Sequence, residues 1–244
     1  MNWSEDGIVL AAREHGESAA ILSLLTESHG RHLGLVRGAK GPKARARYEP
    51  GNRVAASWRG RLDEHLGAYS CEVIASPAAR WLDDPLRLDA LAAATALVDR
   101  VLPEREPHPA LFHGLDALIA SLGEADWAER YVRWEILMLA ELGFGLDLAR
   151  CAATGQRTDL SHVSPKTGRA VSRAAAAPYR ERLLTLPPFL AGGGGATPQE
   201  ILDGLALTGH FLSIHLFDTT PMPAQRQRLL DRLARAAGQN SGHT

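Results

Sequence analysis

The sequence predicts an α+β protein in which a small N-terminal β-barrel precedes a helical region. Up to Ser76 the apolar residues form short runs, and in the last run Tyr69, Cys71 and Val73 fall on one face at a period of two. From Ser76 onward apolar residues recur at helical spacing. The positive charge is concentrated within the barrel region. Because five short strands in so short a segment suit a closed barrel, the five-stranded OB-fold is the expected architecture, and this fold commonly carries single-stranded nucleic acid.

The barrel strands are predicted from five apolar runs bounded by turn residues. These runs cover residues 7–11, 20–26, 32–37, 53–58 and 65–73. Gly30 lies in the short turn between the second and third runs, which is a hairpin signal. Residues 38–47 combine Gly, Pro and four cations, and we expect them to form a mobile basic loop.

The helical region contains four recognisable segments. Apolar stripes predict helices over residues 88–102 and 111–122, and residues 129–142 are apolar on more than one face, which is typical of a central buried helix. Thr197–Glu200 has the pattern of a capping box. A last helix is expected over residues 223–237. Its outer face is expected to carry Arg226, Arg228, Arg232 and Arg235.

The charge distribution is the strongest functional signal. Only Glu49 interrupts the cations between Arg31 and Arg61, so this segment carries +8 while the whole chain carries −1. Such a patch attracts polyanions, of which nucleic-acid backbones are the commonest. A solvated basic loop is the alternative. The candidate phosphate contacts are Arg31, Arg37, Lys40, Lys43, Arg45, Arg47, Arg53, Arg59 and Arg61.

Two aromatic residues lie among these cations. Tyr48 and Trp58 are candidates for stacking on unpaired bases, each contact being worth about 1–3 kcal/mol. A tryptophan in a barrel strand is more often a core residue, so burial is the competing interpretation for Trp58.

Other classes of protein lack support. The two cysteines are too few for a disulfide scaffold and favour a reducing cytoplasm. No signal-peptide pattern or apolar stretch of about 18 residues indicates export or a membrane span. The Gly192–Gly195 run lacks the Lys of a phosphate loop, and His210 and His215 are five apart rather than four. We expect no catalytic residue, metal or cofactor. His29 and His32 flank a turn and could meet phosphate or water.

Five segments together resemble the family of the bacterial recombination mediator RecO. They are Gly7–Leu10, Arg13–Ser18, Leu24–Arg31, Val36–Lys40 and Trp134–Phe144. The resemblance spans nearly the whole chain and is strongest over the first 50 residues. It implies an OB-fold domain over 1–76, a helical domain over 77–150 and 179–244, and a zinc-finger-like segment over 151–178.

That segment departs from the family's frequent pattern of four zinc-binding cysteines. Cys151 matches the first ligand position, whereas Thr154, Ser172 and Ala175 stand at the other three. A structural zinc site needs four strong ligands. We therefore expect a degenerate, zinc-free segment held by packing and hydrogen bonds.

The resemblance implies a DNA repair mediator with several partners. It would bind single- and double-stranded DNA, anneal complementary strands, contact the single-stranded-DNA-binding protein, and join RecR to load the RecA recombinase. Arg130 and Arg133, beside Leu and Trp residues, are the candidates for contacting the acidic tail of the single-stranded-DNA-binding protein. Two alternatives stay open: an RNA-binding or translation-associated OB-fold protein, and an adaptor whose basic segment meets an acidic protein.

Overall fold

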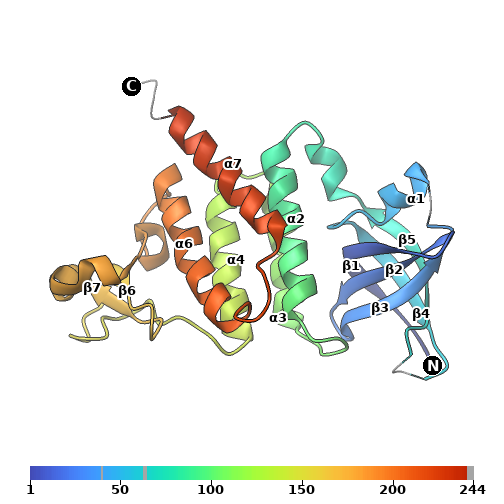
Figure 1. Cartoon of the computed structure of the whole chain (residues 1–244), viewed down its shortest axis with the longest axis horizontal. Helices are drawn as coiled ribbons and strands as arrows, with labels where there is room; N and C mark the ends of the chain where they lie inside the picture. Colours follow the sequence, from blue (N-terminus) through green and yellow to red (C-terminus); the bar gives the residue numbers. More distant parts are fainter. Residues whose placement is uncertain (40, 63–64, 241–244) are drawn as a thin grey trace. The chain divides into compact units, whose positions relative to one another are not determined.

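The fold is α+β, as the sequence predicts. The computed structural model describes residues 1–39, 41–62 and 65–240 (Figure 1). Its N-terminal part contains five strands and one short helix. These elements are β1 (Asn2–His15), β2 (Ala19–Thr26), β3 (Gly30–Arg37), α1 (Pro42–Arg47), β4 (Arg53–Arg59) and β5 (Ala68–Ala75).

The five strands form a closed barrel in the order β1-β2-β3-β5-β4, which is the strand order of an OB-fold. The N-terminal half of β1 pairs with β4 and its C-terminal half pairs with β2. A bulge between Val9 and Ala11 lies close to this change of partner. The parallel pairing of Leu35 with Ala68 closes the barrel between β3 and β5.

The period of two predicted for the fifth strand, through Tyr69, Cys71 and Val73, holds only in part, because Tyr69 is buried, Cys71 is half-buried and Val73 is exposed. The alternation is regular in β4. Along β4, Val54, Ala56 and Trp58 are buried and alternate with more exposed residues. The Trp58 ring is enclosed by two glycines, because a Cβ on Gly60 or Gly67 would lie 2.4 Å from a ring atom. Its Nε1 donates a hydrogen bond to the Leu66 carbonyl at 3.1 Å. Trp58 is therefore a core residue.

The expectation of a mobile loop over residues 38–47 is wrong for Pro42–Arg47, which form α1. A proline fits the first turn of a helix because its missing N–H would have no intrahelical partner there. Arg45 and Arg47 occupy the last turn, where cations interact favourably with the helix dipole. Lys40 lies outside the described residues.

The chain divides into two compact units. The first comprises residues 1–120 and 223–229, and the second comprises the rest. This division places the first helices with the barrel, whereas the sequence predicts a first domain that ends at residue 76. The helical elements of the first unit are η1 (Pro77–Trp81), α2 (Pro85–Val101), α3 (Pro109–Ser121) and the start of α7 (Ala224–Asn240).

One buried carboxylate on α2 connects the barrel strands to that helix. Asp99 accepts hydrogen bonds from Arg13 on β1 and from Ser23 Oγ on β2, the latter at 2.6 Å. Arg31 on β3 places a guanidinium nitrogen 3.9 Å from the same carboxylate. Asp99 thus collects polar groups from three successive strands, which explains why α2 belongs to the barrel unit.

The second unit is centred on α4 (Trp127–Glu141) and α6 (Pro198–His215). The prediction of a central buried α4 is confirmed, since its Tyr131 and Met138 are almost completely buried. Thr208 on α6 donates a hydrogen bond to the buried Glu135 carboxylate of α4. The capping box is also confirmed: Glu200 N–H donates to Thr197 Oγ1 at 3.3 Å, and Thr197 N–H donates to Glu200 Oε2 at 2.8 Å.

A small three-stranded sheet, in the order β7-β6-β8, completes the second unit. Short helical turns follow and connect its strands. These elements are β6 (Leu160–Val163), β7 (Ala170–Ser172), α5 (Arg173–Ala176), η2 (Ala177–Arg182), β8 (Leu184–Thr185) and η3 (Pro188–Ala191). None of the helices described here is long and apolar enough to cross a lipid bilayer.

Candidate nucleic-acid interface

The predicted cations are distributed between two ends of the barrel. Arg37 ends β3, where its pairing partner Ala19 is itself paired with His15 at the end of β1. Arg59 ends β4 opposite Asn2, at the start of β1. Figure 1 shows α1 and the N-terminus at opposite ends of the barrel. The basic segment is therefore continuous in sequence but divided in space.

Arg31 is turned toward α2. Its Nε donates a hydrogen bond to the Leu102 carbonyl at 2.8 Å, its guanidinium faces Asp99, and its side chain is 16% exposed. A backbone contact strengthens this arrangement, because Arg105 N–H donates to the Arg31 carbonyl at 2.8 Å. In this conformation Arg31 serves the packing of the first unit and is not presented to a phosphate.

Arg53 is also engaged by acids. Its Nη1 donates to both carboxylate oxygens of Asp116 at 2.9 Å, and its Nη2 lies 3.6 Å from Asp6 Oδ2. The guanidinium lies 6.0 Å from the ring centroid of Phe112. These partly buried contacts with two acids hold the Arg53 side chain against α3. In this conformation Arg53 therefore contributes to packing and not to a phosphate-binding surface.

The exposed cations form the remaining candidate surface. Arg45 pairs with Glu14 at 2.7 Å, but both side chains are about two-thirds exposed. An exposed pair of this kind contributes about 0–1 kcal/mol, so a phosphate can replace the carboxylate at little cost. Lys43 has a backbone within α1, while its side chain lies outside the described part. Among the described residues no carboxylate pairs with Arg37, Arg47, Arg59 or Arg61.

Neither aromatic candidate is an exposed residue. Tyr48 caps the C-terminus of α1 and packs, half-buried, against the barrel core. Burial, followed by the nearby Cys71, raises the pKa of the Tyr48 phenol, so its hydroxyl stays neutral at ordinary pH. Trp58 is 1% exposed and lies between Gly60 and Gly67. Stacking by Trp58 would require the barrel core to open.

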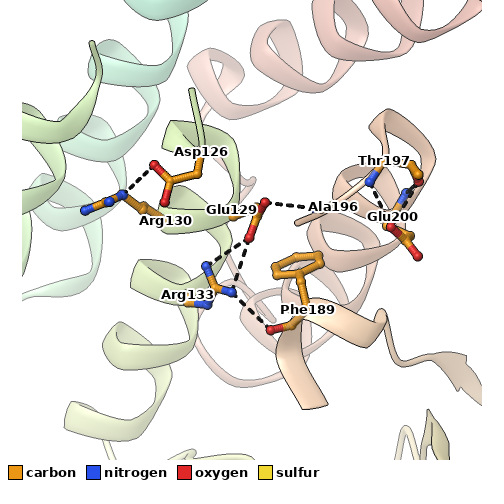
Figure 2. Close-up of polar contacts among 8 residues, drawn as sticks. All are labelled: Asp126, Glu129, Arg130, Arg133, Phe189, Ala196, Thr197 and Glu200. Atoms are coloured by element: carbon orange, nitrogen blue, oxygen red, sulfur yellow. Dashed lines mark hydrogen bonds and ion pairs between the residues drawn. The ribbon is translucent and has the colours of Figure 1, made fainter. Parts of the chain in front are cut away.

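The two candidate partner-binding arginines are held by acids on their own helix turn (Figure 2). Arg130 Nε donates to Asp126 Oδ1 at 2.8 Å. Arg133 lies 3.3 Å from Glu129 Oε2 and also donates to the Phe189 carbonyl at 3.1 Å. The Phe189 ring faces the same guanidinium, with 5.2 Å between the guanidinium carbon and the ring centroid. Arg133 thus supports η3, whereas Arg130 makes only an exposed surface pair.

In the zinc-finger-like segment over residues 151–178, three of the four positions that the family resemblance assigns to zinc ligands lie close together. They are Cys151, Thr154 and Ser172. Ser172 N–H donates to the Cys151 sulfur at 3.2 Å, and the thiol lies 3.4 Å from Ser172 Oγ. Burial alone would raise the pKa of the Cys151 thiol. Hydrogen bonds from Ser172 and Thr154 outweigh that effect and lower the pKa to about 6. Within the described residues no group of three or more His, Cys, Asp or Glu side chains is arranged to hold a metal ion.

The prediction that Arg226 lies on the outer face of the last helix is wrong. Arg226 and Leu229 are buried at a spacing of three, so they share the inward side of α7. Arg228 is exposed, with its Nε 3.8 Å from Asp89 Oδ1 on α2.

Sequence reasoning missed two features of the first unit. The first strand was expected to begin at Gly7, although residues 2–6 already alternate between exposed and half-buried positions, with Trp3 and Glu5 turned inward. Asp99 interrupts an apolar helix stripe, which is a signal for a buried acid with a partner, but its partners lie far away in sequence.

Comparisons with known proteins agree with this architecture. The N-terminal model of the Recombination protein O family matches residues 1–77, and its C-terminal model matches residues 82–222. A DNA repair protein RecO from Rhodospirillum centenum is 55% identical over 240 residues, covering 97% of this chain and 96% of that protein. Its counterpart from Jannaschia sp. is 48% identical over 238 residues, covering 96% and 97%. The Rhodospirillum rubrum protein is 49% identical over 245 residues, again covering 96% and 97%.

The fold and the comparisons define a DNA repair and recombination protein built from an OB-type barrel and helices. The chain belongs to the Recombination protein O family, which confirms the resemblance seen in its sequence.

Proposed function

We propose that this chain is a recombination mediator that binds single- and double-stranded DNA and anneals complementary strands. The observation that carries the proposal is the exposed cationic end of the barrel formed by Arg37, Arg45 and Arg47, which we call the α1 end. Arg37 and Arg47 pair with no carboxylate among the described residues, and the partner of Arg45 is an exposed glutamate. These guanidinium groups are available to phosphates.

Electrostatics gives this surface a role in annealing. Two complementary strands repel each other through their phosphates, and a cationic surface that holds one strand lowers the local repulsion on the other. Pairing then proceeds downhill without a nucleotide cofactor. At the other end of the barrel, Arg59 and Arg61 are exposed and extend the set of proposed phosphate contacts.

The test replaces Arg37, Arg45 and Arg47 together by Ala. We expect weaker binding of single-stranded DNA, slower strand annealing, and a log–log salt dependence that is less steep by about 2, since each lost contact to a single strand removes about 0.7. The matched control replaces Arg157, Arg180 and Arg182, three exposed cations of the second unit, by Ala. If both triple variants bind and anneal alike, the α1 end is not the interface.

Competition by RNA of the same base sequence separates the proposed activity from the RNA-binding alternative. We expect DNA to compete at least as well as RNA. A strong preference for RNA would instead support the RNA-binding alternative with the same surface as its interface, because backbone contacts alone do not distinguish the two sugars.

We further propose that the chain acts with RecR to load the RecA recombinase and contacts the single-stranded-DNA-binding protein. Family membership supports this part of the proposal. For the last partner, Arg130 is the more suitable contact, because an acidic tail needs only to displace Asp126 from an exposed pair. Arg130→Ala should weaken binding of an acidic tail peptide, measured by fluorescence anisotropy, while equal affinity would exclude that contact.

A further inference from the structure

Asn52 lies in the turn between α1 and β4, and its side chain contacts the backbone of α1. The Nδ2 atom donates a hydrogen bond to the Ala46 carbonyl at 2.8 Å and another to the Arg47 carbonyl at 3.1 Å. Both carbonyls belong to the last turn of α1, where a helix leaves its carbonyls without intrahelical partners. One side-chain amide therefore serves two backbone acceptors of α1.

The backbone of Asn52 belongs to the barrel. Its carbonyl accepts a hydrogen bond from Val9 N–H of β1 at 2.8 Å, and Gly51 N–H donates to the Val9 carbonyl at the same distance. Asn52 N–H donates to the Glu49 carbonyl at 3.0 Å and closes the turn. The residue is 1% exposed. Asn52 is therefore a fixed point of the barrel wall from which a polar side chain reaches α1.

The preceding residue, Gly51, brings this turn close to α2. Its φ is 90°, in the region that favours glycine, and a Cβ at this position would lie 2.5 Å from Leu91 Cδ1. Leu91 is itself buried on α2. Because the turn is packed on a buried helix, Asn52 has little freedom to move together with α1.

The geometry requires an amide at position 52. The Asn52 Oδ1 atom is buried and has no hydrogen-bond partner among the described residues, so the two bonds from Nδ2 orient the group. With the amide reversed, Oδ1 would face two carbonyl oxygens, and an aspartate would face them with a negative charge. A buried acceptor without a donor costs stability. The contacts with α1 thus take precedence over the satisfaction of Oδ1.

α1 depends on such contacts because it is too short to be stable alone. It comprises six residues, and no side-chain hydrogen bond caps its N-terminus at Gly41. Two other contacts flank it. Ala39 N–H donates to the Ser18 carbonyl at 3.0 Å before the helix, and the half-buried Tyr48 packs against the barrel core after it. Asn52 connects the last turn itself to the barrel.

That turn carries two of the three cations of the α1 end. Arg45 and Arg47 both belong to it, and Arg47 also provides one of the carbonyls that Asn52 binds. Fixing this carbonyl fixes the backbone from which the guanidinium projects. Groups that must be ordered on binding reduce affinity, so cations on an anchored helix bind a phosphate backbone more tightly than the same cations on a free loop.

We propose that Asn52 is a positioning residue of the nucleic-acid interface, which holds the last turn of α1 to the barrel and thereby sets the arrangement of Arg45 and Arg47. The inference rests on the proposed DNA binding at the α1 end. It adds a residue that is buried and uncharged, and that acts on phosphate only through its neighbours. A charge count does not reveal such a residue.

The first test needs no DNA. NMR measures hydrogen exchange at the amides of Arg45 and Tyr48, which donate to the Gly41 and Arg45 carbonyls at 3.0 Å. We expect exchange about tenfold faster or more in Asn52→Ala, because the last turn of α1 loses its anchor. Asn52→Leu keeps the branched shape of the side chain without its donor and should behave in the same way.

Ser23→Ala is the matched control for this measurement. It removes another buried side-chain hydrogen bond of the barrel, that from Ser23 Oγ to Asp99, and should leave exchange in α1 unchanged. Unchanged exchange in both Asn52 variants, or equal acceleration by Ser23→Ala, would show that Asn52 does not anchor α1.

The second test is a double-mutant cycle on the affinity for an oligothymidylate. Asn52→Ala should weaken binding about three- to tenfold in the parent, and it should have no further effect once Arg45 and Arg47 are both Ala. In an Arg37→Ala background it should keep its full effect, because Arg37 lies on β3 and outside α1. A loss caused by general destabilisation would be the same in all three backgrounds.

The outcomes separate this inference from the proposed interface. If the Arg45 and Arg47 double variant binds DNA like the parent, the α1 end is not an interface and the inference fails with it. If the double variant binds weakly while Asn52→Ala binds like the parent, or loses equal affinity with and without the two arginines, only the positioning role is overturned. A loss that requires both arginines supports it.

Discussion

The backbone N–H of Ser172 donates a hydrogen bond to the sulfur of Cys151 at 3.2 Å, although 21 residues separate them in the chain. Ser172 and Thr154 occupy positions where the family pattern has further cysteines, and both still direct hydrogen bonds at this sulfur. These hydrogen bonds converge on one sulfur and favour the ionised form of the Cys151 thiol.

This geometry predicts a pH-dependent contribution to stability. The pKa of the Cys151 thiol is lowered from 9.0 to about 6, so the ionised form is stabilised in the folded state. The contribution is complete above pH 9 and is lost as the pH falls through 6. Urea unfolding at pH 6 and pH 8.5 should therefore show a greater gain in stability at the higher pH for the parent than for Cys151→Ser.

Cys71→Ser provides the control for that measurement. Burial raises the pKa of the Cys71 thiol to about 12, so Cys71 stays protonated throughout the interval from pH 6 to pH 8.5. An identical pH profile for the parent and Cys151→Ser would show that the thiolate does not form.

A second prediction concerns the glycine beside Trp58. Gly67→Ala should destabilise the protein by about 2–3 kcal/mol or more, because the new methyl group would lie 2.4 Å from a ring atom at a φ of +59°. Gly16→Ala is the matched control: its φ is +62°, and a Cβ would meet no atom within 4 Å. The difference between the two, measured by chemical denaturation, isolates the crowding of the Trp58 ring. Equal costs would contradict a closed core at this point.

A third prediction separates the two arginines of α4. Arg133→Ala removes a hydrogen bond to the Phe189 carbonyl, an ion pair and a cation–π contact, and should cost about 1–2 kcal/mol. Arg130→Ala removes only an exposed ion pair and should cost about 0.5 kcal/mol or less. Thermal unfolding of both variants checks the ranking. A larger loss for Arg130→Ala would reverse the roles assigned here.

A fourth prediction tests whether Arg53 is structural. Arg53→Ala should cost about 1 kcal/mol through loss of the hydrogen bonds from Nη1 to both oxygens of Asp116, with little change in DNA affinity. A double-mutant cycle with Asp116→Asn measures the coupling between the two side chains. A loss of DNA affinity comparable to that of the α1-end triple variant would instead place Arg53 in the interface.

The barrel and the long helices could be predicted because their signals are local. The strand predicted over residues 53–58 and the Thr197–Glu200 capping pattern each depend on neighbouring residues, and each was confirmed. α1 was not foreseen, because the Gly41–Pro42 pair that interrupts a strand also begins a helix there.

Whether each cation is exposed or paired with an acid could not be predicted in the same way. Arg31 and Arg53 belong to the same basic segment as Arg37 and Arg47. The acids Asp99 and Asp116 that engage them lie more than 60 residues further along the chain. Whether a cation faces solvent or a carboxylate depends on tertiary packing, which a charge count does not contain.

The convergence of Arg13, Ser23 and Arg31 on Asp99 also has a dynamic consequence. Opening of the first three strands would leave a buried charge without its donors, so these strands and α2 should open to solvent as one cooperative block. Deuterium uptake in β1, β2, β3 and α2 should then proceed at a common slow rate, and Asp99→Asn should accelerate all four together.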